Sequence, residues 1–86
     1  MTKFNDLYSP AFKKDLKKIR FNFELQNRLE NKIEEVLENP YHYKPLRNVL
    51  KNKRRVHIGS FVLIFEIKEE DNIIVFHSFG HHDEAY

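Results

Sequence analysis

Phe61-Val62-Leu63-Ile64-Phe65 is a run of five apolar residues that no polar residue interrupts. A strand with one face in water alternates apolar and polar residues, whereas a strand buried on both faces is apolar throughout. The run is far too short to span a membrane. It therefore predicts a central strand that is buried on both faces of a sheet.

Short segments rich in β-branched and aromatic residues lie on both sides of this run and indicate further strands at 46–50, 54–58 and 72–79, with the central strand extending over 61–67. Gly59-Ser60 and Glu69-Glu70-Asp71-Asn72 are typical of tight connections. Consecutive strands joined in this way pair antiparallel. We therefore expect a meander of three or four antiparallel strands.

Two amphipathic helices are expected before the strands. Ser9-Pro10 predicts an N-cap followed by proline at the first helical position, and apolar residues then recur at helical spacing to about Arg20. After a break near Phe21-Asn22 the same periodicity continues until Asn39-Pro40 ends it. So short a link predicts a helix hairpin.

The N-terminal residues Phe4, Leu7 and Tyr8 suggest a short extended segment before the first helix. Together these elements predict an α+β fold, in which an N-terminal short strand and a helix hairpin pack on a three- to four-stranded antiparallel sheet. The 86 residues fit one domain, 1–86, with a single modest core.

The composition excludes several classes of protein. The chain has no cysteine, so disulfides, thiolate nucleophiles and zinc-thiolate sites are ruled out, and a disulfide-stapled secreted fold with them. The first residues, Met1-Thr2-Lys3-Phe4-Asn5-Asp6, lack the apolar stretch of a signal peptide. We expect a cytoplasmic protein without a membrane partner.

Charge is distributed unevenly along the chain, although the net charge is only +2. Residues 39–65 carry basic side chains and no carboxylate, which predicts a cationic face suited to RNA or DNA. The alternative is a solvated charged surface, but such surfaces usually intersperse both signs. The basic residues of this stretch are Lys44, Arg47, Lys51, Lys53, Arg54 and Arg55.

Titratable side chains gather at two places that suggest one site. Arg55 and His57 share one face if their segment is a strand. The last seven residues, 80–86, place two imidazoles and a phenol just after an apolar strand. These groups together suit the binding and cleavage of a phosphodiester, because imidazoles titrate near neutrality.

Several motifs resemble, in their order and spacing, the RelE/ParE toxins of toxin-antitoxin pairs, and the resemblance covers nearly the whole chain. The motifs are Ser9-Pro10-Ala11-Phe12-Lys13-Lys14-Asp15-Leu16, Glu38-Asn39-Pro40-Tyr41, Lys44-Pro45-Leu46-Arg47, Arg55-Val56-His57-Ile58-Gly59, and Gly80-His81-His82 with Tyr86.

The resemblance implies a toxin with a cognate antitoxin, with which it forms a complex such as a heterotetramer. RelE-like members enter the ribosomal A site and cleave mRNA. The implied chemistry is attack of a ribose 2′-hydroxyl on the adjacent phosphorus, which leaves a 2′,3′-cyclic phosphate and needs no metal or cofactor. ParE-like members share the fold and inhibit DNA gyrase instead.

Within the family the chain looks closest to a YafQ-like subset that uses histidines. The resemblance implies His57 as base, His82 as acid, Arg55 as phosphate clamp and Tyr86 as a stacking platform, and the two proton-transfer roles are interchangeable. Lys44 stands where the subset carries another histidine, so Lys44 and His57 both remain candidates for the base. Phosphate or RNA contacts are expected from Lys44, Arg47, Lys51, Lys53 and Arg54.

The remaining histidines are interpreted as structural: His42 as loop packing, His77 as a satisfied sheet residue, and His81 as facing away from the site. His57 also has a structural alternative, an exposed strand residue without chemistry. Val62 stands where the family commonly has an arginine, which favours the alternative of a gyrase inhibitor without nuclease activity. A passive RNA-binding domain is the third hypothesis.

Overall fold

The apolar run at 61–65 lies in strand β3 (Phe61–Lys68), which is flanked by β2 (Lys53–Ile58) and β4 (Ile73–His81). The structure, a computed structural model, describes residues 3–43 and 53–81 of the chain. Val62 and Leu63 point to opposite faces of the sheet, and both are fully buried. The prediction of a central strand buried on both faces is confirmed at this point of β3.

Strands β2, β3 and β4 form the antiparallel meander that the sequence predicts. Gly59 connects β2 to β3 with a φ of +61°, a left-handed conformation that glycine adopts without a steric penalty. A 3₁₀ turn, η2 (Glu69–Asp71), connects β3 to β4 and ends at Asn72, which is also left-handed. The strand expected at 46–50 lies outside the described residues.

The fourth strand, β1 (Asn5–Tyr8), is the short extended segment expected at the N-terminus, and it pairs with β4 in parallel, a pairing that the sequence did not predict. The sheet is mixed, with the order β1-β4-β3-β2. Parallel neighbours need a long crossover connection, and here both helices and two strands lie between β1 and β4. Backbone bonds from Asn5 N to Asn72 O (2.9 Å) and from Ser9 N to Phe76 O (3.1 Å) hold both ends of the pairing.

Helix α1 (Pro10–Lys18) begins at the predicted cap. The Ser9 hydroxyl accepts a hydrogen bond from Phe12 N (3.0 Å) and donates one to the His77 carbonyl (2.9 Å). The second bond reaches a β-bulge, because His77 has no partner in the β3–β4 register. One side chain therefore both starts the helix and fixes it to β4.

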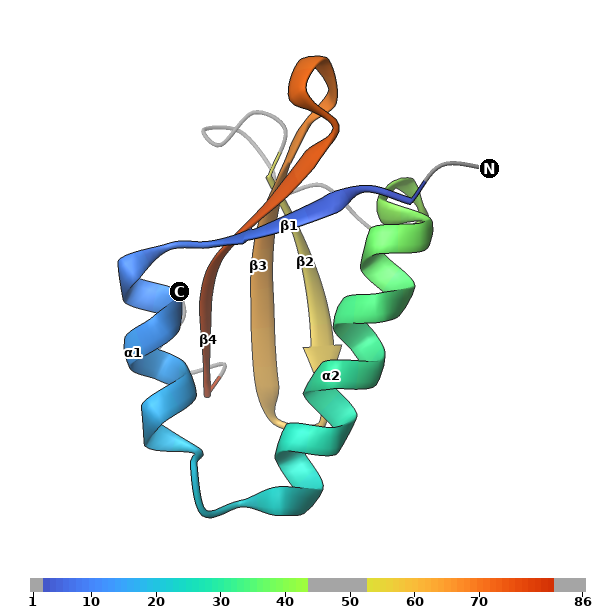
Figure 1. Ribbon diagram of the computed structural model, residues 1–86. Coiled ribbons are helices and arrows are strands. Elements are labelled where there is room, and N and C mark those ends of the chain that lie inside the picture. Colours follow the sequence, from blue (N-terminus) through green and yellow to red (C-terminus); the bar gives the residue numbers. More distant parts are fainter. Residues whose placement is uncertain (1–2, 44–52, 82–86) are drawn as a thin grey trace.

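Helix α2 (Phe23–Glu38) starts at Asn22, whose side chain accepts from Leu25 N (3.1 Å), and ends before Pro40, as predicted. A short 3₁₀ helix, η1 (Pro40–His42), follows it. Figure 1 shows α1 beside β4 and α2 beside β2, with the connection between the helices at the same end of the molecule as the β2–β3 turn. The predicted helix hairpin is confirmed.

Both helices contribute to one hydrophobic cluster and therefore cover the same face of the sheet. Phe76 is at its centre, with ring contacts to Tyr8, Phe12 and Phe65. Val56 of β2 belongs to this cluster. Because side chains alternate along a strand, its neighbours Arg55 and His57 point to the opposite face. The face away from the helices, called the outer face below, carries Lys53, Arg55, His57, Val62, Ile64 and Glu66. Neither helix, in the portion of the chain that is described, is long and apolar enough to cross a membrane.

Candidate active site on the outer face

Strand β2 places Lys53, Arg55 and His57 in one row on the outer face, opposite Glu66, Ile64 and Val62 of β3. The prediction that Arg55 and His57 share a face is confirmed, because both belong to a regular strand with period-two alternation. The His57 side chain is exposed. The row therefore presents two cations and an imidazole to a ligand.

A hollow of about 330 Å³ lies beside this row and is lined by His42, Tyr43, Arg55, Val56 and His57. Its second wall comes from η1, far from β2 in sequence. Burial, and secondly the Glu35 carboxylate, raises the pKa of the Tyr43 phenol. The hollow thus brings two imidazoles able to transfer protons, those of His42 and His57, close to the Arg55 guanidinium, which can stabilise negative charge on phosphate.

His42 is the member of this site that the sequence interpretation missed. Its ring does pack edge-on against Tyr43, at 5.1 Å between centroids, which confirms the predicted loop packing. The side chain is nevertheless exposed and lines the same hollow as His57. One feature of the sequence pointed to it: His42 stands two residues before Lys44, where the resemblance implies another histidine.

Arg54 lies on the other side of β2, opposite the buried Phe65. Its Nη1 donates to the Tyr43 carbonyl at 2.7 Å, and its guanidinium carbon is 5.3 Å from the centroid of the Tyr41 ring. Its Nε atom is buried without a hydrogen-bond partner. Arg54 therefore fixes the segment that carries His42 to β2, and its role as a phosphate contact stays a prediction.

Val62 is the direct partner of His57 in the β2–β3 ladder and is fully buried. The position at which the resemblance implies an arginine therefore lies next to the imidazole but carries no charge. Arg55, on the same face and two residues from His57, is the guanidinium that the structure places at this site.

The other described histidines do not line this hollow. The His77 Nε2 atom is 2.8 Å from a carboxylate oxygen of Glu66, which confirms a satisfied sheet histidine. The His81 ring packs edge-on against Phe61, at 5.8 Å between centroids, and lines a different hollow beside α1. His81 thus points away from His57, as predicted.

Five predicted site residues lie outside the described residues, and their roles stay predictions. They are the acid His82, the stacking residue Tyr86 and the RNA or phosphate contacts Lys44, Arg47 and Lys51.

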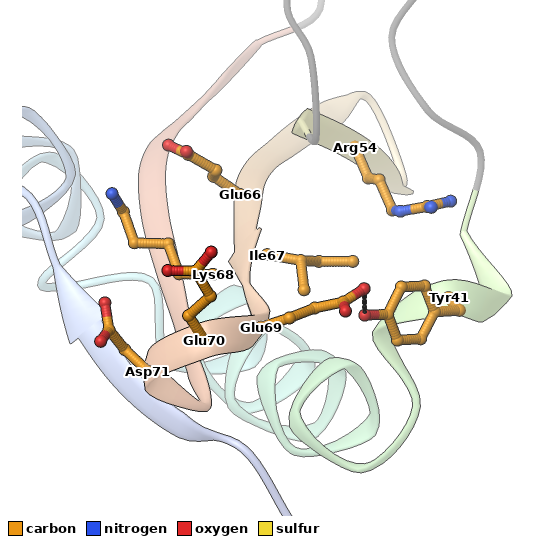
Figure 2. Close-up of a pocket in the computed structure, with 8 residues that line it drawn as sticks. All are labelled: Tyr41, Arg54, Glu66, Ile67, Lys68, Glu69, Glu70 and Asp71. Carbon is orange, nitrogen blue, oxygen red and sulfur yellow. Dashed lines mark hydrogen bonds between the residues drawn. The ribbon is translucent and has the colours of Figure 1, made fainter.

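A larger hollow of about 540 Å³ lies at the opposite end of β2, and Figure 2 shows its lining. Its charged groups are mostly carboxylates, and the Tyr41 hydroxyl donates a hydrogen bond to Glu69 that raises the pKa of Tyr41. Such a lining repels phosphate, so we place the candidate site at the smaller hollow. Over residues 3–43 and 53–81, no three His, Asp or Glu side chains are grouped so as to hold a metal ion. The lining residues are Tyr41, Arg54, Glu66, Ile67, Lys68, Glu69, Glu70 and Asp71.

Comparison with known sequences identifies the family. A model described as the ParE toxin of type II toxin-antitoxin system, parDE, matches residues 7–86. The chain is also 37% identical over 87 residues to the Methanocaldococcus jannaschii protein named "Putative toxin RelE4", and the match covers 100% of this chain and 85% of that protein.

Solved structures show the same fold. A chain of the E. coli DinJ-YafQ toxin-antitoxin complex matches with a TM-score of 0.81 and 21% identity, over 99% of both chains. The RelBE2 toxin-antitoxin complex from Mycobacterium tuberculosis matches with a TM-score of 0.80 and 21% identity, over 93% of this chain and 99% of that chain. The fold likeness agrees with the sequence matches, and the chain therefore belongs to the RelE/ParE superfamily of toxins from type II toxin-antitoxin systems.

Proposed function

We propose that this toxin is a ribosome-dependent endoribonuclease that cleaves mRNA within the ribosomal A site. The observation that carries the proposal is the row on the outer face, where Arg55 and the exposed His57 line one hollow. The phosphates of a nucleic-acid backbone can bind to such a row, because their negative charge complements the cations.

In the proposed reaction His57 takes the proton of a ribose 2′-hydroxyl. The 2′-oxygen then bonds to the adjacent phosphorus, and the bond from phosphorus to the 5′-oxygen breaks. A second imidazole, in its protonated form, gives its proton to that departing oxygen. Arg55 stabilises the negative charge that gathers on the phosphate oxygens. The products are a 2′,3′-cyclic phosphate and a free 5′-hydroxyl.

Two residues are candidates for the acid. His82 is the one that the resemblance implies, and His42 is the one that shares a hollow with His57. Either residue fits the role, because an imidazole can both donate and accept a proton.

Dependence on the ribosome fits the shape of the site. In the part of the chain that the structure describes, the hollow beside β2 is small and lies at the edge of the sheet, so these residues hold proton-transfer groups without enclosing a nucleotide. A ribosome that holds the mRNA in a fixed geometry would supply positioning beyond what these residues provide, and positioning alone accounts for a large part of many rate enhancements.

A cognate antitoxin is the second partner that we propose. The DinJ-YafQ and RelBE2 structures are complexes of a toxin with its antitoxin. For this chain we expect an amphipathic and partly disordered antitoxin that wraps the toxin and neutralises its basic face.

Gyrase inhibition is the alternative, and two observations favour it. The matching family model is that of the ParE toxin, and the position next to His57 carries a buried valine instead of an arginine. This hypothesis gives His57 no chemical role and predicts gyrase-dependent DNA breaks with intact mRNA.

Primer extension on a defined mRNA tests the proposal. The purified toxin is added to that mRNA in a programmed ribosome and, in parallel, to the same mRNA without ribosomes. We expect cleavage only on the ribosome and within the A-site codon. Intact mRNA in both reactions, together with loss of supercoiling by purified gyrase, would replace the proposal by the alternative.

A further inference from the structure

The connection between α1 and α2 presents two aromatic side chains to solvent. Phe21 is 78% exposed and Phe23 is 67% exposed, the largest exposed fractions among the large hydrophobic residues that the structure describes. Phe21 and Phe23, two positions apart, expose apolar side chains that the core of the fold does not use, and exposed apolar surface of this kind can bind a partner.

The connection holds these rings in a defined place. Asn22 N donates to the Ile19 carbonyl at 2.9 Å, and the Gln26 side chain donates to the same carbonyl at 2.8 Å. Ile19 and Leu25, on either side of the turn, are buried in the core. Because its neighbours are anchored, the backbone of the turn that carries Phe21 and Phe23 is held in one conformation, which lowers the entropic cost of binding.

Basic residues precede the two rings closely in the sequence. Lys17, Lys18 and Arg20 are exposed, and the Arg20 guanidinium carbon lies 4.9 Å from the centroid of the Phe21 ring. Glu24 is the exposed carboxylate nearest in sequence. Asp15 accepts a hydrogen bond from Phe79 N and lies 3.8 Å from the Lys18 ammonium, so three cations face two carboxylates. The local charge is therefore positive.

The same end of the molecule carries the β2–β3 turn (Figure 1). The Arg28 guanidinium lies against that turn, with its nitrogens 3.5 Å from where a Cβ on Gly59 would be. Arg28 thus extends the positive charge from the helices toward the strand that carries His57.

We propose that this aromatic-basic tip, consisting of Lys17, Lys18, Arg20, Phe21 and Phe23, binds single-stranded RNA. Bases stack on the phenylalanine rings while the cations contact phosphates, which is how proteins bind single strands without reading their sequence. The tip is a protruding turn and not a groove, so it suits flat bases better than a helix or strand of a protein partner. The proposal deepens the ribosome-dependent function but concerns binding alone.

The test measures the fluorescence anisotropy of a labelled oligonucleotide of about ten nucleotides, long enough for a typical single-strand site. Its 2′-hydroxyls are methylated, so it cannot be cut by 2′-hydroxyl attack. Phe21→Leu and Phe23→Leu keep an apolar side chain but remove the ring. Since stacking contributes about 1–3 kcal/mol per base, each should weaken binding by roughly 5- to 150-fold.

Matched variants separate stacking from other effects. Phe21→Trp should bind the oligonucleotide at least as tightly as the wild type, because tryptophan offers a larger stacking surface. Leu7→Ala removes another exposed apolar side chain, 53% exposed on β1, and should leave the affinity unchanged. Arg20→Gln should make the negative slope of log affinity against log salt concentration shallower by about 0.7, the value for one phosphate contact on a single strand.

Unchanged affinity for the oligonucleotide in the double variant Phe21→Leu/Phe23→Leu would overturn the proposal. If this double variant also keeps wild-type binding to vesicles of anionic lipid, the tip is a membrane contact and not an RNA-binding site. Failure of the ribosome cleavage assay does not affect this result, since no bond is broken in the binding measurement.

Discussion

The two faces of the sheet differ in what their side chains contact. On the helix side, Phe65 and Phe76 are fully buried and Arg54 holds the Tyr41–Tyr43 segment. On the outer face, the same strand β2 presents Arg55 and exposed His57. Because alternate residues of one strand serve the two faces, substitutions one position apart should separate stability from activity.

The largest effect is expected from His57→Gln on the outer face. Loss of a general acid or base typically lowers a rate by about a hundred- to ten-thousand-fold, so cleavage on the ribosome should fall by that factor. The free energy of unfolding should stay within about 0.5 kcal/mol of the wild type, because the side chain is exposed. Single-turnover cleavage and urea unfolding measure the two quantities.

His77→Gln is the matched control for this variant. It makes the same substitution in a histidine that pairs with Glu66 of the outer face. We expect its cleavage rate to match the wild type. Equal loss of cleavage in both variants would show that the effect of His57 is structural and not chemical.

Phe76→Ala should have the next largest effect, on stability. The ring contacts Tyr8, Phe12 and Phe65 at the centre of the core, and Phe→Ala in such a site costs about 3–5 kcal/mol. Urea unfolding followed by circular dichroism measures this cost. A loss below about 1 kcal/mol, the size of a typical surface or minor core change, would contradict the description of the helix-side core.

Arg54→Gln and Arg55→Gln compare the faces most directly, since the residues are adjacent. Arg54→Gln removes a charged hydrogen bond to the Tyr43 carbonyl and should lower the free energy of unfolding by about 1.5–3 kcal/mol. Arg55→Gln should lower cleavage by about a hundred- to a thousand-fold, the usual effect of losing one donor to developing charge. The reverse pattern would mean that Arg54 is the phosphate clamp.

The smallest expected effect is on the pH dependence of stability and comes from Tyr8 on the helix side of the sheet. Burial, followed by hydrogen bonding to Asp6, raises the pKa of Tyr8 to about 12 from its ordinary value of 10.0. Below pH 10 both folded and unfolded chains keep this proton. As pH rises from 10 toward 12 the unfolded chain loses it first, so stability falls over this range.

Tyr8→Phe should remove part of this alkaline decline, because phenylalanine has no proton to lose. The measurement is urea unfolding below pH 10 and near pH 12 for both proteins. Identical pH profiles would show that Tyr8 titrates alike in the folded and unfolded chains.

Most elements of the fold follow from local patterns. The Ser9 cap, the end of α2 before Pro40 and the three strands of the meander are all predicted by short-range periodicity and turn residues. The shared face of Arg55 and His57 follows from strand alternation alone. These features depend on residues a few positions apart, so a single sequence contains them.

The omissions involve residues far apart in the chain. The parallel pairing of β1 with β4 joins residues 5–8 to 73–76, and the hollow beside β2 joins His42 to His57. Periodicity predicts that such segments are strands or turns but does not say which of them become neighbours.

The sequence by itself determined the elements, the faces of β2 and the residue types available for chemistry. Only the tertiary structure decided which of these residues meet: Arg54 turns to Tyr41 and Tyr43, Val62 is buried beside His57, and His42 lines the same hollow. The physical reason is that long-range neighbours are chosen by the burial of one shared core. That burial depends on all the elements at once, whereas capping and alternation depend on each element alone.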